Sequence, residues 1–93
     1  MSEKDIEQAL VRKAKSMGGI ALKFVSPGFD GMPDRLVLFP GGRIAFVEMK
    51  APGKKPRAIQ VARHEMLKSM GFSVYVLDDK DEIGEMLDEI QSS

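Results

Sequence analysis

The chain has 93 residues, 43% of them hydrophobic and 30% charged, which is typical of one small globular domain over residues 1–93 that would gain stability from dimerisation. It has no cysteine, which excludes disulfides and cysteine chemistry, and no apolar run long enough for a membrane span or leader, so we expect a cytoplasmic protein without membrane contact. The net charge is zero, but residues 1–77 hold 13 basic and 7 acidic side chains, a net charge of +6 that suits a polyanion, whereas residues 78–93 hold seven acids and one base.

The hydrophobic pattern predicts three helices and four strands in the order αβββαβα. The first helix covers residues 3–17, with Ser2 as its N-cap, Asp5 at the third helical position and glycines at its end. The second helix covers residues 58–70, and the third begins at Asp78 or Asp79 and runs to about Gln91. The predicted strands cover residues 20–25, 34–39, 43–49 and 72–77. A hairpin followed by a strand–helix–strand crossover implies an α/β (α+β) fold, with helices packed on a mixed sheet.

The hairpin brings two carboxylates together. With its centre at Gly41, residue pairs add up to 82, so Asp34 faces Glu48 across the two strands. Directly opposed residues have Cβ atoms roughly 4.5–5.5 Å apart, and two like charges at that distance repel unless a cation lies between them. A hard divalent ion such as Mg²⁺ or Mn²⁺ fits oxygen ligands of this kind. A bulge at Pro40 would shift the register by one residue and separate the pair.

The alternation of strand residues adds a lysine to the pair. Glu48 and Lys50 are two residues apart and share a face, at the charged end of a strand that is otherwise apolar on both faces. Carboxylates can hold a metal that lowers the pKa of bound water, and a lysine can stabilise developing negative charge. The alternative is that Asp34 is a turn residue and that Glu48 and Lys50 form a surface ion pair. Spacing alone favours the two interpretations equally.

These residues also form a known signature. Gly31-Met32-Pro33-Asp34 followed by Glu48-Met49-Lys50 matches the PD-(D/E)xK nuclease motif. Together with Ser2-Glu3 and Ile6, the run V-E-x-K-A-P over residues 47–52 and Gln60, the sequence resembles the VRR-NUC (virus-type replication-repair nuclease) family over nearly its whole length. The resemblance implies a PD-(D/E)xK restriction-endonuclease-like core and a Mg²⁺- or Mn²⁺-dependent endodeoxyribonuclease. Small stand-alone members come from phages and bacteria and resemble Holliday-junction resolvases, which implies a homodimer acting on branched or four-way DNA.

The resemblance also implies the roles of individual residues. Asp34 and Glu48 correspond to metal ligands, with the backbone carbonyl of Met49 as a further ligand, and Lys50 corresponds to the catalytic lysine. Gln60 corresponds to a group that orients Lys50 or the substrate phosphate. A glutamate of the first helix completes the family's site, and both Glu3 and Glu7 qualify because they are four residues apart on one helix face.

Other residues have two readings each. We expect the basic side chains near the site to contact DNA phosphates, with a solvated surface as the alternative; they are Lys54, Lys55, Arg57 and Arg35. The run over residues 51–57 lacks the pattern of a phosphate-binding P-loop, so we expect no nucleotide cofactor. His64 shares a helix face with Gln60 and either contacts DNA or carries a proton, or is simply exposed or packed. Phe29 either stacks on a DNA base or folds back into its loop. The alternative function for the whole chain is a DNA-binding module or assembly subunit without catalysis.

Overall fold

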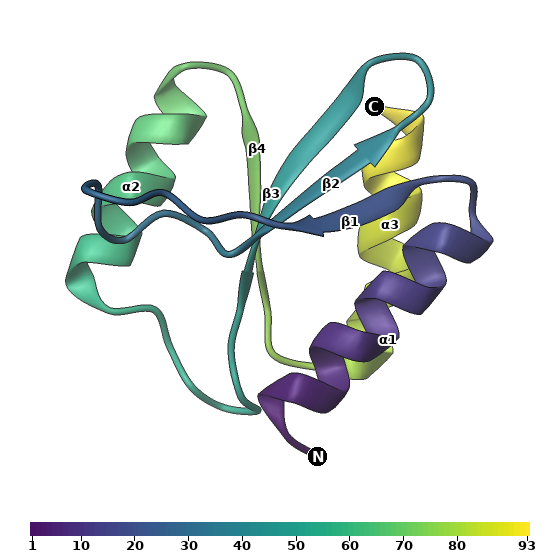
Figure 1. Ribbon diagram of the computed structural model, residues 1–93, viewed down its shortest axis with the longest axis horizontal. Coiled ribbons are helices and arrows are strands. Elements are labelled where there is room, and N and C mark those ends of the chain that lie inside the picture. Colours follow the sequence, from purple (N-terminus) through teal and green to yellow (C-terminus); the bar gives the residue numbers. More distant parts are fainter.

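The computed structural model describes all residues 1–93 and contains a four-stranded mixed sheet between two layers of helices (Figure 1). The elements are α1 (Glu3–Ser16), β1 (Ile20–Lys23), β2 (Arg35–Phe39), β3 (Arg43–Met49), α2 (Ala58–Ser69), β4 (Ser73–Leu77), a 3-10 turn η1 (Lys80–Glu82) and α3 (Ile83–Ser92). The strands lie in the order β1-β2-β3-β4, with antiparallel pairing up to β3 and parallel pairing of β3 with β4. The predicted element order and mixed sheet are confirmed.

Local side-chain chemistry sets the ends of two helices. Ser2 and Asp5 form the predicted capping box of α1, because each side chain accepts a hydrogen bond from the backbone N–H of the other. The prediction for the third helix was too simple. The Asp79 side chain accepts a hydrogen bond from the N–H of Asp81, which closes the 3-10 turn η1, and α3 itself begins only at Ile83.

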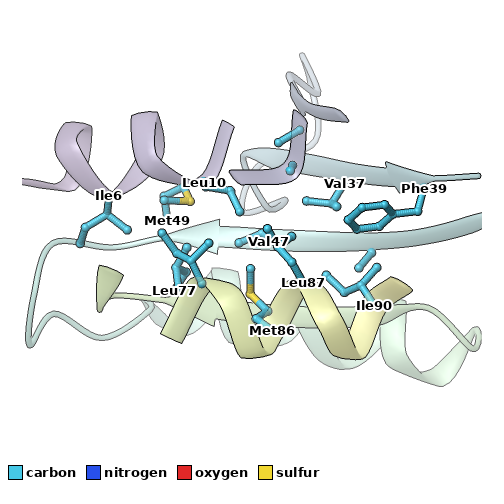
Figure 2. Packing of buried hydrophobic residues seen from close by; sticks show 14 residues of the cluster. Ile6, Leu10, Val37, Phe39, Val47, Met49, Leu77, Met86, Leu87 and Ile90 are labelled. Carbon is cyan, nitrogen blue, oxygen red and sulfur yellow. The ribbon is translucent and has the colours of Figure 1, made fainter. Parts of the chain in front are cut away.

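One face of the sheet carries the main hydrophobic core. The side chains of α1 and α3 point toward the central strand β3, as Figure 2 shows for Leu10 and Leu87 around Val47 and Met49. All four of these side chains are almost completely buried, and each contributes roughly 1.5–3 kcal/mol of burial free energy. This core packs against one face of β3 and fixes the position of the strand. The residues on the opposite face of β3 are therefore held on a rigid backbone.

The opposite face is covered only in part. Phe46 lies at its centre, with edge-to-face contacts to Phe24 and Phe72 at centroid distances of 5.8 Å each. Helix α2 packs beside β4, on the side of the sheet away from α1 and α3 (Figure 1). Toward β1 the face is open, and Ile20 and Leu22 are exposed there. None of the helices is both long and apolar enough to cross a membrane.

The hairpin between β2 and β3 has the predicted register. Phe39 pairs with Arg43 and Val37 pairs with Ala45, so paired residue numbers add up to 82 and no bulge interrupts the ladder. Gly41 has a φ of 90°, a left-handed conformation that favours glycine at this turn. The predicted register is therefore confirmed, and it brings the residue before β2 beside the last residues of β3.

Candidate active site

Asp34 and Glu48 lie at the same end of the sheet. Asp34 directly precedes β2, and its backbone carbonyl accepts a hydrogen bond from Phe24, which continues the pairing with β1. Its side-chain Oδ1 accepts a hydrogen bond of 2.9 Å from the backbone N–H of Met49. The Asp34 carboxylate is thus fixed on the backbone of the neighbouring strand, one residue from Glu48.

Glu48 is a buried carboxylate with partners on both of its oxygens. It lies on the α2 side of β3 and is only 2% exposed. Its Oε1 is 3.1 Å from Nε2 of His64, and its Oε2 accepts a hydrogen bond of 3.3 Å from the amide nitrogen of Gln60. Gln60 is held in turn, since its Oε1 accepts a 2.8 Å hydrogen bond from the N–H of Arg57 at the start of α2. The first turns of α2 therefore fix the orientation of this carboxylate.

The surroundings of Asp34 oppose its ionisation. Burial raises the pKa of Asp34 above its ordinary value of 3.8, and the hydrogen bond from Met49 offsets part of this effect. The negative charges of Glu7 and Glu3 raise the pKa further, Glu7 more strongly. Both helix-one glutamates thus act on Asp34 through space, and a cation beside Asp34 would relieve their repulsion.

The surroundings of Glu48 also oppose its ionisation. Burial raises its pKa above the ordinary value of 4.5, and the hydrogen bond to His64 lowers it in part. The charge of Asp34 raises the pKa of Glu48, whereas the charge of Lys50 lowers it. The charges of Asp34 and Lys50 thus both reach Glu48, one opposing its ionisation and the other favouring it.

The two carboxylates fit a divalent ion. No three His, Cys, Asp or Glu side chains gather closely enough to hold a metal by protein ligands alone. Mg²⁺ and similar ions are commonly bound through one or two carboxylates and keep several water ligands, so Asp34 and Glu48 supply a sufficient donor set. No side-chain donor reaches the Asp34 carboxylate, which therefore keeps acceptor capacity for such an ion.

Helix α1 contributes an ion pair beside the carboxylates. Oε2 of Glu7 lies 2.9 Å from Nε of Arg35, and Nη1 of Arg35 donates to the backbone carbonyl of Ala21. The Arg35 side chain is thus engaged within the protein, and this conformation does not present it as the phosphate contact expected from the sequence. Glu3 is exposed at the start of the same helix and makes no ion pair.

Lys50 and the basic loop continue from the end of β3. The backbone N–H of Lys50 donates to the carbonyl of Leu77 at 2.9 Å, which extends the pairing with β4 and leaves Lys50 half-buried. Lys54, Lys55 and Arg57 are exposed in the loop that leads from Lys50 to α2. The loop therefore presents three cationic side chains between two residues of the candidate site, Lys50 and Gln60.

His64 has a larger part in this site than the sequence indicated. Its spacing of four residues from Gln60 placed both on one face of α2, but nothing in the sequence showed which strand that face would meet. The structure turns both side chains toward Glu48, and Gln60 contacts Glu48 rather than Lys50. The sequence therefore did not predict that His64 and Gln60 would both contact the buried Glu48 carboxylate.

Comparison with known proteins agrees with this fold. No family model matches the sequence. The chain is 53% identical over 79 residues, 85% of each protein, to "Putative nuclease p44" of Acyrthosiphon pisum secondary endosymbiont phage 1. A solved structure described as a VRR_NUC domain superimposes with a TM-score of 0.85 at 29% identity, covering 92% of this chain and 94% of that one. The chain belongs to the VRR-NUC family of nuclease domains, as the sequence resemblance indicated.

Proposed function

We propose that this protein is a divalent-metal-dependent DNA endonuclease that cuts branched DNA. The observation that carries the proposal is the proximity of Asp34 and Glu48 at the end of a buried strand, with the charge of Lys50 also acting on Glu48. Burial raises the pKa of both carboxylates, and the charge of Asp34 raises that of Glu48 further; carboxyl groups perturbed in this way are concentrated at functional sites. The phage relative named as a nuclease and the VRR_NUC structure support the same activity.

Each residue has a role in this proposal. Asp34 and Glu48 hold a Mg²⁺ or Mn²⁺ ion, with the Met49 carbonyl as a further ligand. The ion, when bound, polarises the phosphate and lowers the pKa of a coordinated water. Lys50 stabilises the negative charge that develops on the phosphate during attack. Gln60 keeps the Glu48 carboxylate oriented through its amide.

The cleavage of a four-way DNA junction tests the proposal. Wild-type protein should cut the junction with Mg²⁺ and not with a chelator, and more readily than a linear duplex. Glu48→Gln and Lys50→Ala should each lower the rate by about 10²–10³-fold while the protein still binds DNA. Glu65→Gln and Lys68→Ala change charges that are exposed on α2 and should cut normally. Tight binding by wild type without metal-dependent cutting would instead support the alternative, a DNA-binding module without catalysis.

We also propose that the protein acts as a homodimer. The apolar face of α1 packs into the core, where Ile6, Leu10 and Ala14 are completely buried. Helix α1 therefore offers little apolar surface to a second copy. The open part of the sheet at β1 does offer it, through Ile20 and Leu22. Light scattering should give the mass of a dimer at micromolar concentration, and Leu22→Glu should give a folded monomer. A monomeric wild type would count against paired cutting of a junction.

A further inference from the structure

A cavity with two arginines and a phenylalanine lies beside the candidate active site. Its volume is about 670 Å³, within the range of ligand-binding pockets, and it opens between the β1–β2 loop and the start of α2. The loop reaches across to α2, as its dark blue trace in Figure 1 shows. The residues of the cavity that can recognise a ligand are Phe29 from the loop, Arg57 just before α2 and Arg63 from α2.

The arginine and the aromatic ring form a fixed pair. The guanidinium carbon of Arg63 lies 3.9 Å from the centroid of the Phe29 ring, and Arg63 Nε donates a 2.7 Å hydrogen bond to the carbonyl of Asp30. The other N–H groups of Arg63 have no hydrogen-bond partner within the protein. Phe29 is 40% exposed although it is a large apolar side chain, so the pair presents flat aromatic and cationic surface to solvent.

The walls of this cavity continue directly into the candidate site. Gly31 has a φ of 88°, and a Cβ placed on it would lie 2.8 Å from the carbonyl oxygen of Ile59, so the loop rests closely on α2. Asp34 follows three residues after Gly31, and Gln60 is the residue after Ile59. The cavity is therefore linked to the candidate site through two short stretches of backbone, one in the loop and one in α2.

This combination of groups matches one kind of ligand. An aromatic ring with a stacked guanidinium offers a platform for a nucleobase, and base stacking of this kind does not depend on the identity of the base. Arg57, exposed at the rim, can bind the phosphate of the same nucleotide. A base inside a duplex is covered on both faces by its neighbours and cannot reach such a platform unless it leaves the stack.

We propose that the cavity binds one unpaired nucleotide of the DNA substrate next to the phosphate that is cut. The inference rests on the proposed nuclease function and adds a physical basis for preferring branches with unpaired arms, such as forks and flaps, because these supply an unpaired nucleotide without opening a base pair. The alternative is that the contact of Phe29 with Arg63 only holds the loop in place. In that case, the loss of the Phe29–Arg63 contact would weaken binding of forked and blunt DNA equally, or would weaken neither.

Binding of forked DNA without cleavage tests the proposal. The measurements are made in a chelator, so a protein that fails to cut can still show the nucleotide site. Phe29→Leu should weaken binding of a duplex with unpaired arms by about 5- to 100-fold, the usual loss for one stacked base, and leave binding of a blunt duplex unchanged. Arg57→Gln, at an exposed position, should weaken the forked complex more than the blunt one, because Arg57 can also contact a duplex phosphate. Phe72→Leu is the matched control because Phe72 is 39% exposed but lies just before β4 and does not line the cavity.

Photochemical crosslinking locates the base directly. 5-Iododeoxyuridine placed in turn at each unpaired position should crosslink from the position nearest the fork, with the adduct on Phe29 in the tryptic peptide of residues 24–35. Adducts only on other peptides would overturn the proposal, as would equal losses for forked and blunt DNA in Phe29→Leu. Tight binding of free deoxythymidine monophosphate at micromolar concentration would also overturn it, because it would indicate a pocket for free nucleotides rather than DNA.

Discussion

Glu48 occupies a position where the fold would ordinarily place an apolar residue. It lies in the central strand, 2% exposed, and its neighbours Val47 and Met49 belong to the hydrophobic core on the other face. Its carboxylate keeps partners in His64 and Gln60, so burial leaves no oxygen without a hydrogen bond. A residue that breaks the local pattern while its surroundings are arranged to tolerate it is typical of a functional site.

The raised pKa values of Asp34 and Glu48 predict how stability depends on pH. A carboxyl that holds its proton more tightly in the folded than in the unfolded chain favours folding when it is protonated. The free energy of unfolding of the metal-free protein should therefore rise as the pH falls from about 7 toward the ordinary pKa values of 3.8 and 4.5. Urea denaturation at a series of pH values measures this slope.

The double variant Asp34→Asn with Glu48→Gln is the control for that slope. It removes both ionisable groups, so its stability should change less with pH over the same range, and at neutral pH it should exceed that of wild type. The measurements stay above about pH 4.5, because Asp5 has a lowered pKa from its hydrogen bonds with Ser2 and contributes the opposite slope in stronger acid. An equal slope in both proteins would show that other groups cause it.

The contact of His64 with Glu48 predicts a second effect at this scale. His64→Leu removes the partner of Glu48 Oε1 and should lower manganese affinity and cleavage rate by about 10- to 100-fold, as for other residues that orient metal ligands. His64→Gln keeps a side-chain hydrogen-bonding group and should recover part of both. Calorimetric titration with Mn²⁺ separates this role from a purely structural one, in which stability would fall but metal affinity would not.

At the scale of elements, the sequence was informative wherever contacts are local. Gly41 and its neighbours predicted the hairpin, and the constant sum of paired residue numbers then placed Asp34 opposite Glu48 before any coordinates were needed. The positions of Gln60 and His64 relative to β3 could not be predicted in the same way. They depend on how α2 is rotated against the sheet, which is set by packing between residues distant in sequence.

The β1–β2 loop gives the prediction at this scale. Gly31 and Gly28 both have left-handed φ values, of 88° and 80°, but only Gly31 lies close to another element. Gly28→Ala should cost about 1–2 kcal/mol through its backbone conformation alone. Gly31→Ala should cost at least about 1 kcal/mol more, because its Cβ would meet Ile59 and push the loop from α2. Thermal unfolding of the two variants measures the difference, and equal losses would mean that the loop is not tightly seated.

At the scale of the whole molecule, the acidic helix α3 and the candidate site lie on opposite faces of the sheet. The acidic side chains of α3 lie on the face of the sheet that carries the core, whereas the candidate site and α2 lie on the opposite face. The basic loop over residues 50–57 connects directly to the candidate site. The zero net charge of the chain therefore combines an acidic C-terminal segment with a basic remainder. A DNA backbone would contact the local excess of positive charge.

This separation predicts the salt dependence of DNA binding. Each phosphate neutralised by a basic side chain contributes about −0.9 to the slope of log affinity against log salt concentration for duplex DNA. Replacing Lys54, Lys55 and Arg57 with Gln should therefore make the slope shallower by up to about 2.7. Replacing Glu85, Asp88 and Glu89 with Gln or Asn changes as many charges on the exposed side of α3 and should leave the slope nearly unchanged. Fluorescence anisotropy from about 50 to 200 mM salt measures both slopes. If the α3 variant altered the slope as much as the loop variant, the DNA would be responding to overall charge rather than to contacts beside the site.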